Sequence, residues 1–144
     1  MAAQNGSDVV SLLGFPLLLI PLAIYNILTF LIPIDWQAPL TTIPMMSGGE
    51  WTISFADIVM ALAIILLMFE TVKATRTSSR SIVDHMLSTL VFVAALVEFL
   101  LVPRVATSTF ALIVLICLID VIGGYTVSIR TARRDYSIER ADTL

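Results

Sequence analysis

Two carboxylic acids lie inside long apolar stretches of this chain, where no capping role explains them. Glu98 falls in the segment Ile82–Val102, and Asp120 falls in the segment Thr107–Ser128. An ionisable side chain costs roughly 2.5–3.5 kcal/mol near the centre of a bilayer and is therefore a functional candidate. From the helical rise per residue, we predict Asp120 about 3 Å and Glu98 about 9 Å from the middle of their helices. Acids at such depths can relay protons or cations.

Hydroxyl and imidazole groups occupy a depth from which they could reach Asp120. His85, Ser88 and Thr89 lie in the inner half of the third apolar segment, which a short turn joins to the segment of Asp120. Helices joined by a short turn are antiparallel neighbours. We therefore expect Asp120 to face the protein interior and to hydrogen-bond to one of these three residues. The most polar stripe of the third segment should face the bundle; it comprises Asp84, Ser88, Val91, Ala95 and Glu98.

These intramembrane acids have a structural interpretation and a conducting one. A buried carboxyl group that bonds to hydroxyl groups fixes the register of neighbouring helices or docks a partner subunit. Alternatively, Asp120, Glu98 and His85 are stepping groups for a proton or a cation. We favour the structural interpretation. His85 by itself is weak evidence for a ligand site, because a single histidine beside an acid at a helix start is more often a satisfied polar residue than a ligand. Enzyme chemistry is the third and weakest alternative.

Two further acids are expected to cap helices. Ser54 is followed three residues later by Asp57, and Ser81 by Asp84. This spacing is that of a capping box, in which the two side chains bond to each other's backbone N–H groups. A negative charge also stabilises the positive end of the helix dipole. We therefore assign all four residues to helix capping.

The residues required for metal or cofactor chemistry are scarce. The chain has one cysteine, Cys117, and one histidine, whereas a structural zinc site typically needs four ligands. We recognise no catalytic or nucleotide-binding motif in the sequence. We predict a protein that is not an enzyme, with no metal, no cofactor and no nucleic-acid partner.

The composition predicts an integral membrane protein. Of the 144 residues, 58% are hydrophobic and the mean hydropathy is +0.99, whereas a soluble domain is roughly 45–50% apolar. Four segments are about 20 residues long, enough to cross the hydrocarbon core as helices; they cover about 9–32, 54–72, 82–102 and 107–128. We predict an all-α membrane protein, a single four-transmembrane-helix bundle over 1–144. Pro16 and Pro21 predict a bend in its first helix.

Basic residues predict the orientation of this bundle. Seven of the eight lie between the second and third segments or after the fourth, and Arg104 is the exception. Because Lys and Arg stay on the cytoplasmic side, both termini and the tail 130–144 are predicted to be cytoplasmic.

A short extracytoplasmic β-hairpin is predicted at about 40–53, between the first two helices. Two β-prone runs, Leu40–Ile43 and Glu50–Ile53, flank the pair Gly48-Gly49, and glycine supplies the positive φ that a hairpin turn needs. Trp36 and Trp51 are predicted to anchor this connection at the membrane interface, where tryptophan is enriched.

Several motifs resemble those of a known family. They are Glu50-Trp51-Thr52-Ile53-Ser54, Phe69-Glu70-Thr71-Val72-Lys73-Ala74-Thr75-Arg76, Ser81-Ile82-Val83-Asp84-His85, Val97-Glu98-Phe99-Leu100-Leu101-Val102 and Leu118-Ile119-Asp120-Val121-Ile122. Over Leu40 to Arg130 the chain resembles a family of small, uncharacterised, four-span inner-membrane proteins of alphaproteobacteria. The resemblance implies a multi-pass protein of a bacterial inner (plasma) membrane and implies no activity.

The sequence therefore predicts a small integral membrane protein of unknown activity. We expect a non-enzymatic accessory or scaffold subunit that packs in the lipid bilayer against a second copy or a larger membrane complex. The alternative is a small oligomeric channel or a proton-coupled transporter that uses the intramembrane acids.

Overall fold

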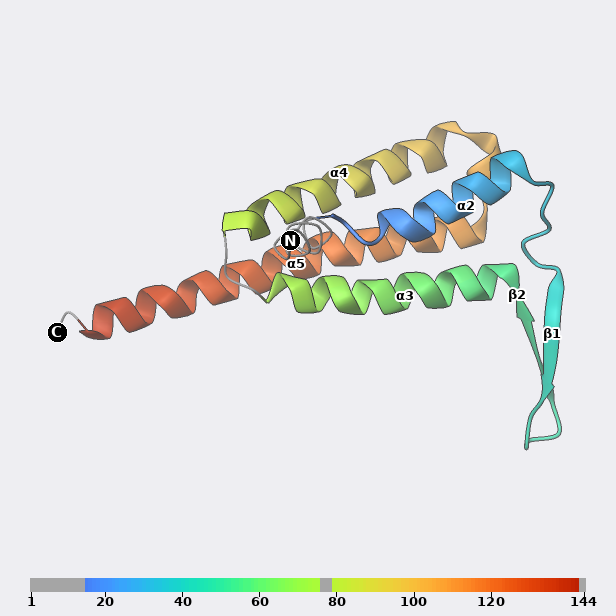
Figure 1. Ribbon diagram of the computed structural model, residues 1–144, viewed down its shortest axis with the longest axis horizontal. Coiled ribbons are helices and arrows are strands. Elements are labelled where there is room, and N and C mark those ends of the chain that lie inside the picture. The colour runs from blue at the N-terminus through green and yellow to red at the C-terminus, as the bar shows by residue number, and fades with distance from the viewer. Residues whose placement is uncertain (1–14, 76–78, 143–144) are drawn as a thin grey trace, which may run out of the picture.

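The computed structural model describes residues 15–75 and 79–142, which form a helical bundle with a two-stranded sheet at one end (Figure 1). In chain order the elements are α2 (Leu19–Leu31), β1 (Pro39–Pro44), β2 (Glu50–Ser54), α3 (Phe55–Ala74), α4 (Ser79–Leu101), the 3-10 helix η1 (Pro103–Val105) and α5 (Ser108–Asp142). The predicted helical fold with a small antiparallel hairpin is confirmed.

Three helices in the described part of the chain are long and apolar enough to cross a membrane. Their apolar windows cover Phe55–Ala74, Val83–Leu101 and Ser108–Val127, close to the last three predicted segments. Large apolar side chains project from them into the surroundings; examples are Ile64 on α3, Leu90 on α4 and Ile122 on α5. Such continuous apolar surface is unusual on a soluble monomer.

The first predicted span differs from the observed helix. Residues 9–14 lie outside the described residues, and α2 has only 13 residues, a length of about 20 Å. Two prolines explain where it begins. The carbonyl group of Pro16 accepts the Leu19 N–H in a turn before the helix (3.1 Å), and Pro21 lies in the first helical turn, where a missing N–H costs no helical bond. In the described residues the prolines therefore lie at the start of the helix. The predicted bend stays a prediction, because the preceding part of the span lies outside the described residues.

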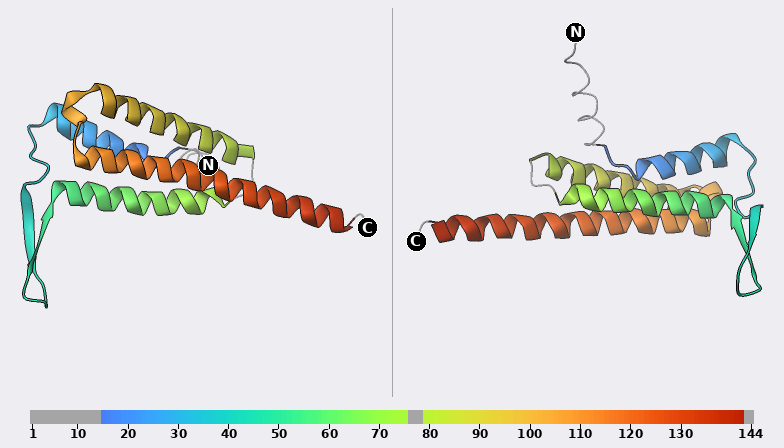
Figure 2. Two further views of the ribbon diagram at one scale, coloured as in Figure 1. Left: turned by 180° about the vertical axis from the view of Figure 1, so that it is seen from behind. Right: turned by 60° about the horizontal axis from the view of Figure 1, so that its bottom comes forward.

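The helices lie side by side, and α5 packs against both α3 and α4 (Figures 1 and 2). The hairpin, η1, the end of α2 and the start of α3 gather at one end of the bundle, which we call the hairpin end. At the opposite tail end, α5 projects past the other helices. The predicted fourth span and the start of the predicted tail form one continuous helix of 35 residues.

The hairpin runs across the direction of the helices (Figure 1). Its strands are antiparallel, with Thr42 opposite Thr52 and Ile43 opposite Trp51. Gly48 has a φ of 82°, as its predicted turn position requires. Because side chains alternate between the two faces of a strand, one face carries the threonine pair and the other carries Ile43 and Trp51. Trp51 is 53% exposed.

Trp36, which was predicted to anchor the connection at the membrane interface, packs inside the fold. Its ring stacks on Tyr25, with centroids 4.3 Å apart and an interplanar angle of 11°, and the side chain is buried. Tyr25 also contacts Phe110 (5.0 Å between centroids), and its hydroxyl group lies 2.6 Å from that of Thr107. These contacts join α2 to the start of α5. Trp36 is buried because it completes this aromatic cluster.

One of the two predicted helix caps has the expected geometry. Ser54 is the N-cap of α3, and both hydrogen bonds of its capping box with Asp57 are present. The second predicted cap does not match, because α4 begins at Ser79 and has no acid in its first turn. Ser81 lies within that turn, and its side chain is outside the described residues; Asp84 lies deeper in the helix.

Candidate functional site

Polar side chains are enclosed between α3, α4 and α5 near the tail end. We call them the tail-end polar cluster: Glu70, Lys73, Asp84, His85, Ser88 and Asp120, which together line one small cavity. Four of the six were candidates in the sequence analysis: Asp84, His85, Ser88 and Asp120. Asp84, which was assigned to a cap, instead faces this cavity.

Asp120 faces the protein interior and is 8% exposed. The hydroxyl group of Ser88, which is also buried, donates a hydrogen bond to the Asp120 carboxyl group and so joins α4 to α5. Thr89, another candidate partner, bonds within its own helix instead: its hydroxyl group donates to the His85 carbonyl (2.8 Å). The same hydroxyl lies 3.4 Å from that of Tyr125.

His85 packs into a position that one glycine of α5 leaves free. The imidazole is buried and lies against the Tyr125 ring, with centroids 5.6 Å apart. A Cβ atom built on Gly124 would lie 2.6 Å from His85 Nδ1, whereas one built on Gly123 would meet no heavy atom within 4 Å. Glycine is a residue type that lets transmembrane helices approach closely. Only Gly124 has that role in this structure.

The sequence analysis did not predict that Glu70 and Lys73 lie in the interior, because their spacing of three residues is that of an ordinary ion pair on a helix surface. Their ion pair (3.0 Å) is largely buried, with side chains only 6% and 11% exposed. The Leu17 N–H donates a hydrogen bond to Glu70 Oε1, and Lys73 Nζ donates one to the Phe15 carbonyl (3.0 Å). The pair therefore attaches the segment before α2 to the tail-end part of α3.

A sequence signal for this burial was available. The side chains of Ala56 and Ala63 are buried on α3, and Glu70 follows at the same seven-residue spacing. Residues seven apart share one face of a helix. Small residues on a transmembrane helix favour close packing against a neighbour, so this stripe indicated that Glu70 faces the bundle.

Glu98 is separate from the cluster and lies near the hairpin end. Its Oε2 accepts a hydrogen bond from Asn26 Nδ2 (3.0 Å), which joins α4 to α2. Along α4, Glu98 is ten residues beyond Ser88, about 15 Å. Ala95, Ile113 and Cys117 are buried between these levels, each no more than 2% exposed. Asp120 and Glu98 thus belong to two polar sites with apolar packing between them.

The tail-end polar cluster has room for very little beyond its own side chains. Its cavity measures about 10 Å³, close to the smallest volume that holds one water molecule. In the described parts of the chain, no group of three or more His, Cys, Asp or Glu side chains is arranged to hold a metal ion. The chemistry available here is hydrogen bonding and ion pairing between helices.

Comparisons with known proteins found no relative of this chain. No protein-family model matches it, and neither a curated protein nor a solved structure does.

Proposed function

We propose that this chain is a four-span protein of a bacterial inner membrane and a non-enzymatic scaffold or accessory subunit of a membrane assembly. The observation that carries the proposal is the distribution of polarity: charged and hydroxyl groups between the helices bond to one another, while large apolar side chains face outward. This arrangement suits a lipid environment, where buried polar groups need internal partners.

In this proposal, α2 and the turn before it form a span in addition to α3, α4 and α5. Phe15 is bonded to Lys73 near the tail end of α3, and α2 ends at Leu31 at the hairpin end. Lys73 is 18 residues beyond Phe55, so the segment from Phe15 to Leu31 accompanies α3 for about 27 Å. That distance is close to the thickness of the hydrocarbon core.

The orientation follows from the charges at the two ends of the bundle. Lys73 and Arg130 lie at the tail end, and Arg104 lies at the hairpin end. We assign the tail end and both termini to the cytoplasm, because seven of the eight basic residues belong to that side. The hairpin would then lie along the outer membrane surface, since it runs across the helices.

Two features favour a scaffold over a conductor. Asp120, Glu70 and Glu98 each have a bonding partner on another part of the fold, so their polarity is used to hold helices together. No polar path joins Asp120 to Glu98 in the described residues, because apolar side chains fill the intervening level. The conducting alternative needs a water-filled path, and the 10 Å³ cavity is far too small to provide one.

Site-specific photo-crosslinking in intact cells tests the scaffold proposal. A photoreactive amino acid at Trp51, on the exposed hairpin, should crosslink to a second copy or to another membrane protein. The same probe at Ile113, which is fully buried, is the matched control and should crosslink only within the chain. A protein that remains monomeric and free of protein crosslinks from Trp51, and from exposed positions such as Leu90 and Ile122, would contradict the proposal.

A further inference from the structure

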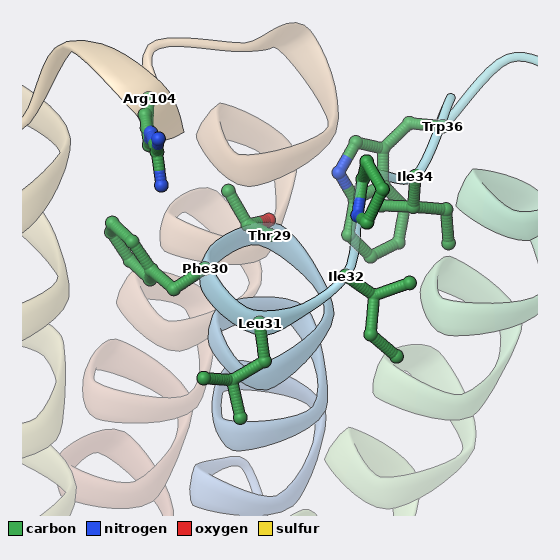
Figure 3. A pocket seen from close by; sticks show the side chains of 8 residues that line it. Thr29, Phe30, Leu31, Ile32, Ile34, Trp36 and Arg104 are labelled. Carbon is green, nitrogen blue, oxygen red and sulfur yellow. The ribbon is translucent and has the colours of Figure 1, made fainter.

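A second, larger pocket lies at the hairpin end, beside the last turn of α2 (Figure 3). It measures about 440 Å³, within the range of ligand sites in proteins. The continuous segment Thr29–Ile34 forms most of its wall, and Trp36 and Arg104 complete it. None of these residues belongs to the tail-end polar cluster.

Arg104 supplies a positive charge that the fold leaves without an anion. Its guanidinium group lies 5.9 Å from the centroid of the Phe30 ring, and in the described residues it forms no ion pair. Figure 3 shows the side chain directed toward Phe30 and Thr29. The hydroxyl group of Thr29 is buried and has no hydrogen-bond partner among the described residues. That oxygen is enclosed, so the polar group that the pocket offers to a ligand is the Arg104 guanidinium.

The remaining wall of the pocket is apolar and reaches the outer face of the bundle. Leu31 is 76% exposed and Ile32 is 49% exposed. Both lie at the end of α2, where the hydrocarbon region of a bilayer gives way to the headgroup layer. A ligand that fits both parts of the pocket carries an anion next to a hydrocarbon chain.

We propose that this pocket binds the phosphodiester headgroup of a phospholipid, with Arg104 contacting the phosphate and Leu31 and Ile32 contacting the upper acyl chain. A guanidinium group matches phosphate oxygens with two parallel hydrogen bonds. A soluble anion would use Arg104 but not the apolar wall, which favours a lipid. The inference rests on the proposed membrane insertion and is independent of the scaffold role, because binding is measured on the isolated chain.

Native mass spectrometry of the full chain in detergent tests the site, with phosphatidylglycerol and the matching diacylglycerol as probes. The wild type should bind one phosphatidylglycerol tightly and diacylglycerol weakly. Arg104→Gln should weaken the first lipid-binding step about tenfold, the usual scale for a lost charge-assisted contact. Arg130→Gln removes an exposed charge at the opposite end and is the matched control, which should bind as the wild type does. Arg104→Lys should retain part of the affinity, because it keeps the charge without the planar fork.

Several results would overturn the lipid assignment. Equal weakening by Arg104→Gln and Arg130→Gln would mean that lipid adheres through general charge. Diacylglycerol binding as tight as that of phosphatidylglycerol would exclude a phosphate contact. Displacement of the lipid by millimolar inorganic phosphate would assign the pocket to a free anion. The melting temperature of each variant in detergent verifies that the fold is intact.

Discussion

Replacement of Gly124 by alanine is the sharpest test of how α4 and α5 pack. The new methyl group would lie 2.6 Å from Nδ1 and 2.7 Å from Cε1 of His85, well inside van der Waals contact. The imidazole has little freedom to move away, because it is buried and lies against Tyr125. Overpacking of this kind costs about 1–3 kcal/mol. Alanine recovers roughly 0.5–1 kcal/mol through its helix propensity, so we expect a net loss of about 0.5–2 kcal/mol for Gly124→Ala.

Gly123→Ala is the matched control, because it adds the same methyl group one residue away in open space. It should leave stability unchanged or raise it by about 0.5–1 kcal/mol. The assay is unfolding in mixed micelles of dodecyl maltoside and sodium dodecyl sulfate, followed by tryptophan fluorescence. The two variants should differ by about 1–3 kcal/mol, and a His85→Ala background should remove most of that difference. Equal stability of the two glycine variants would refute the packing of His85 on α5.

Three other predictions concern the ion pair, the topology and the cap. Glu70→Ala should cost about 3 kcal/mol, because it leaves the largely buried Lys73 without the carboxylate that forms its ion pair. The double Ala variant should cost less than the sum of the single variants, and strict additivity in the unfolding assay would contradict the pairing. Cysteines introduced at Ser47 and Thr77 should react with a membrane-impermeant thiol reagent from opposite sides of the membrane; labelling of both in intact cells would refute the topology. Asp57→Asn should lower the free energy of unfolding only slightly, because Asn can still accept the capping hydrogen bonds and only the charge is lost; a large loss would give the carboxylate a role beyond capping.

The features that sequence reasoning predicted well depend on short-range patterns. The hairpin follows from two β-prone runs around Gly48, and the start of α3 follows from the spacing of Ser54 and Asp57. The interior position of Asp120 and its bond to Ser88 follow from the polar stripe of α4 and the short turn at η1. In each case the prediction depended on the spacing of residues that are close together in the sequence.

The features that it missed depend on contacts between distant parts of the chain. Glu70 is buried because Leu17, 53 residues earlier, bonds to it. Trp36 looked like an interface anchor from its type alone, and it is buried because Tyr25 supplies a ring on which to stack. No local pattern specifies that such partners meet, although the alanine stripe of α3 could have indicated the burial of Glu70.

Proton flux into liposomes tests most directly whether Asp120 and Glu98 hold helices together or conduct protons. The purified chain is reconstituted into vesicles that contain a pH-sensitive dye, and a potassium diffusion potential drives proton entry. We predict that vesicles with the wild-type chain acidify at the rate of empty vesicles, and that Asp120→Asn and Glu98→Gln leave this rate unchanged while the proteins remain folded. A proton flux that depends on the wild-type chain, and that Asp120→Asn abolishes in a folded protein, would contradict the scaffold account.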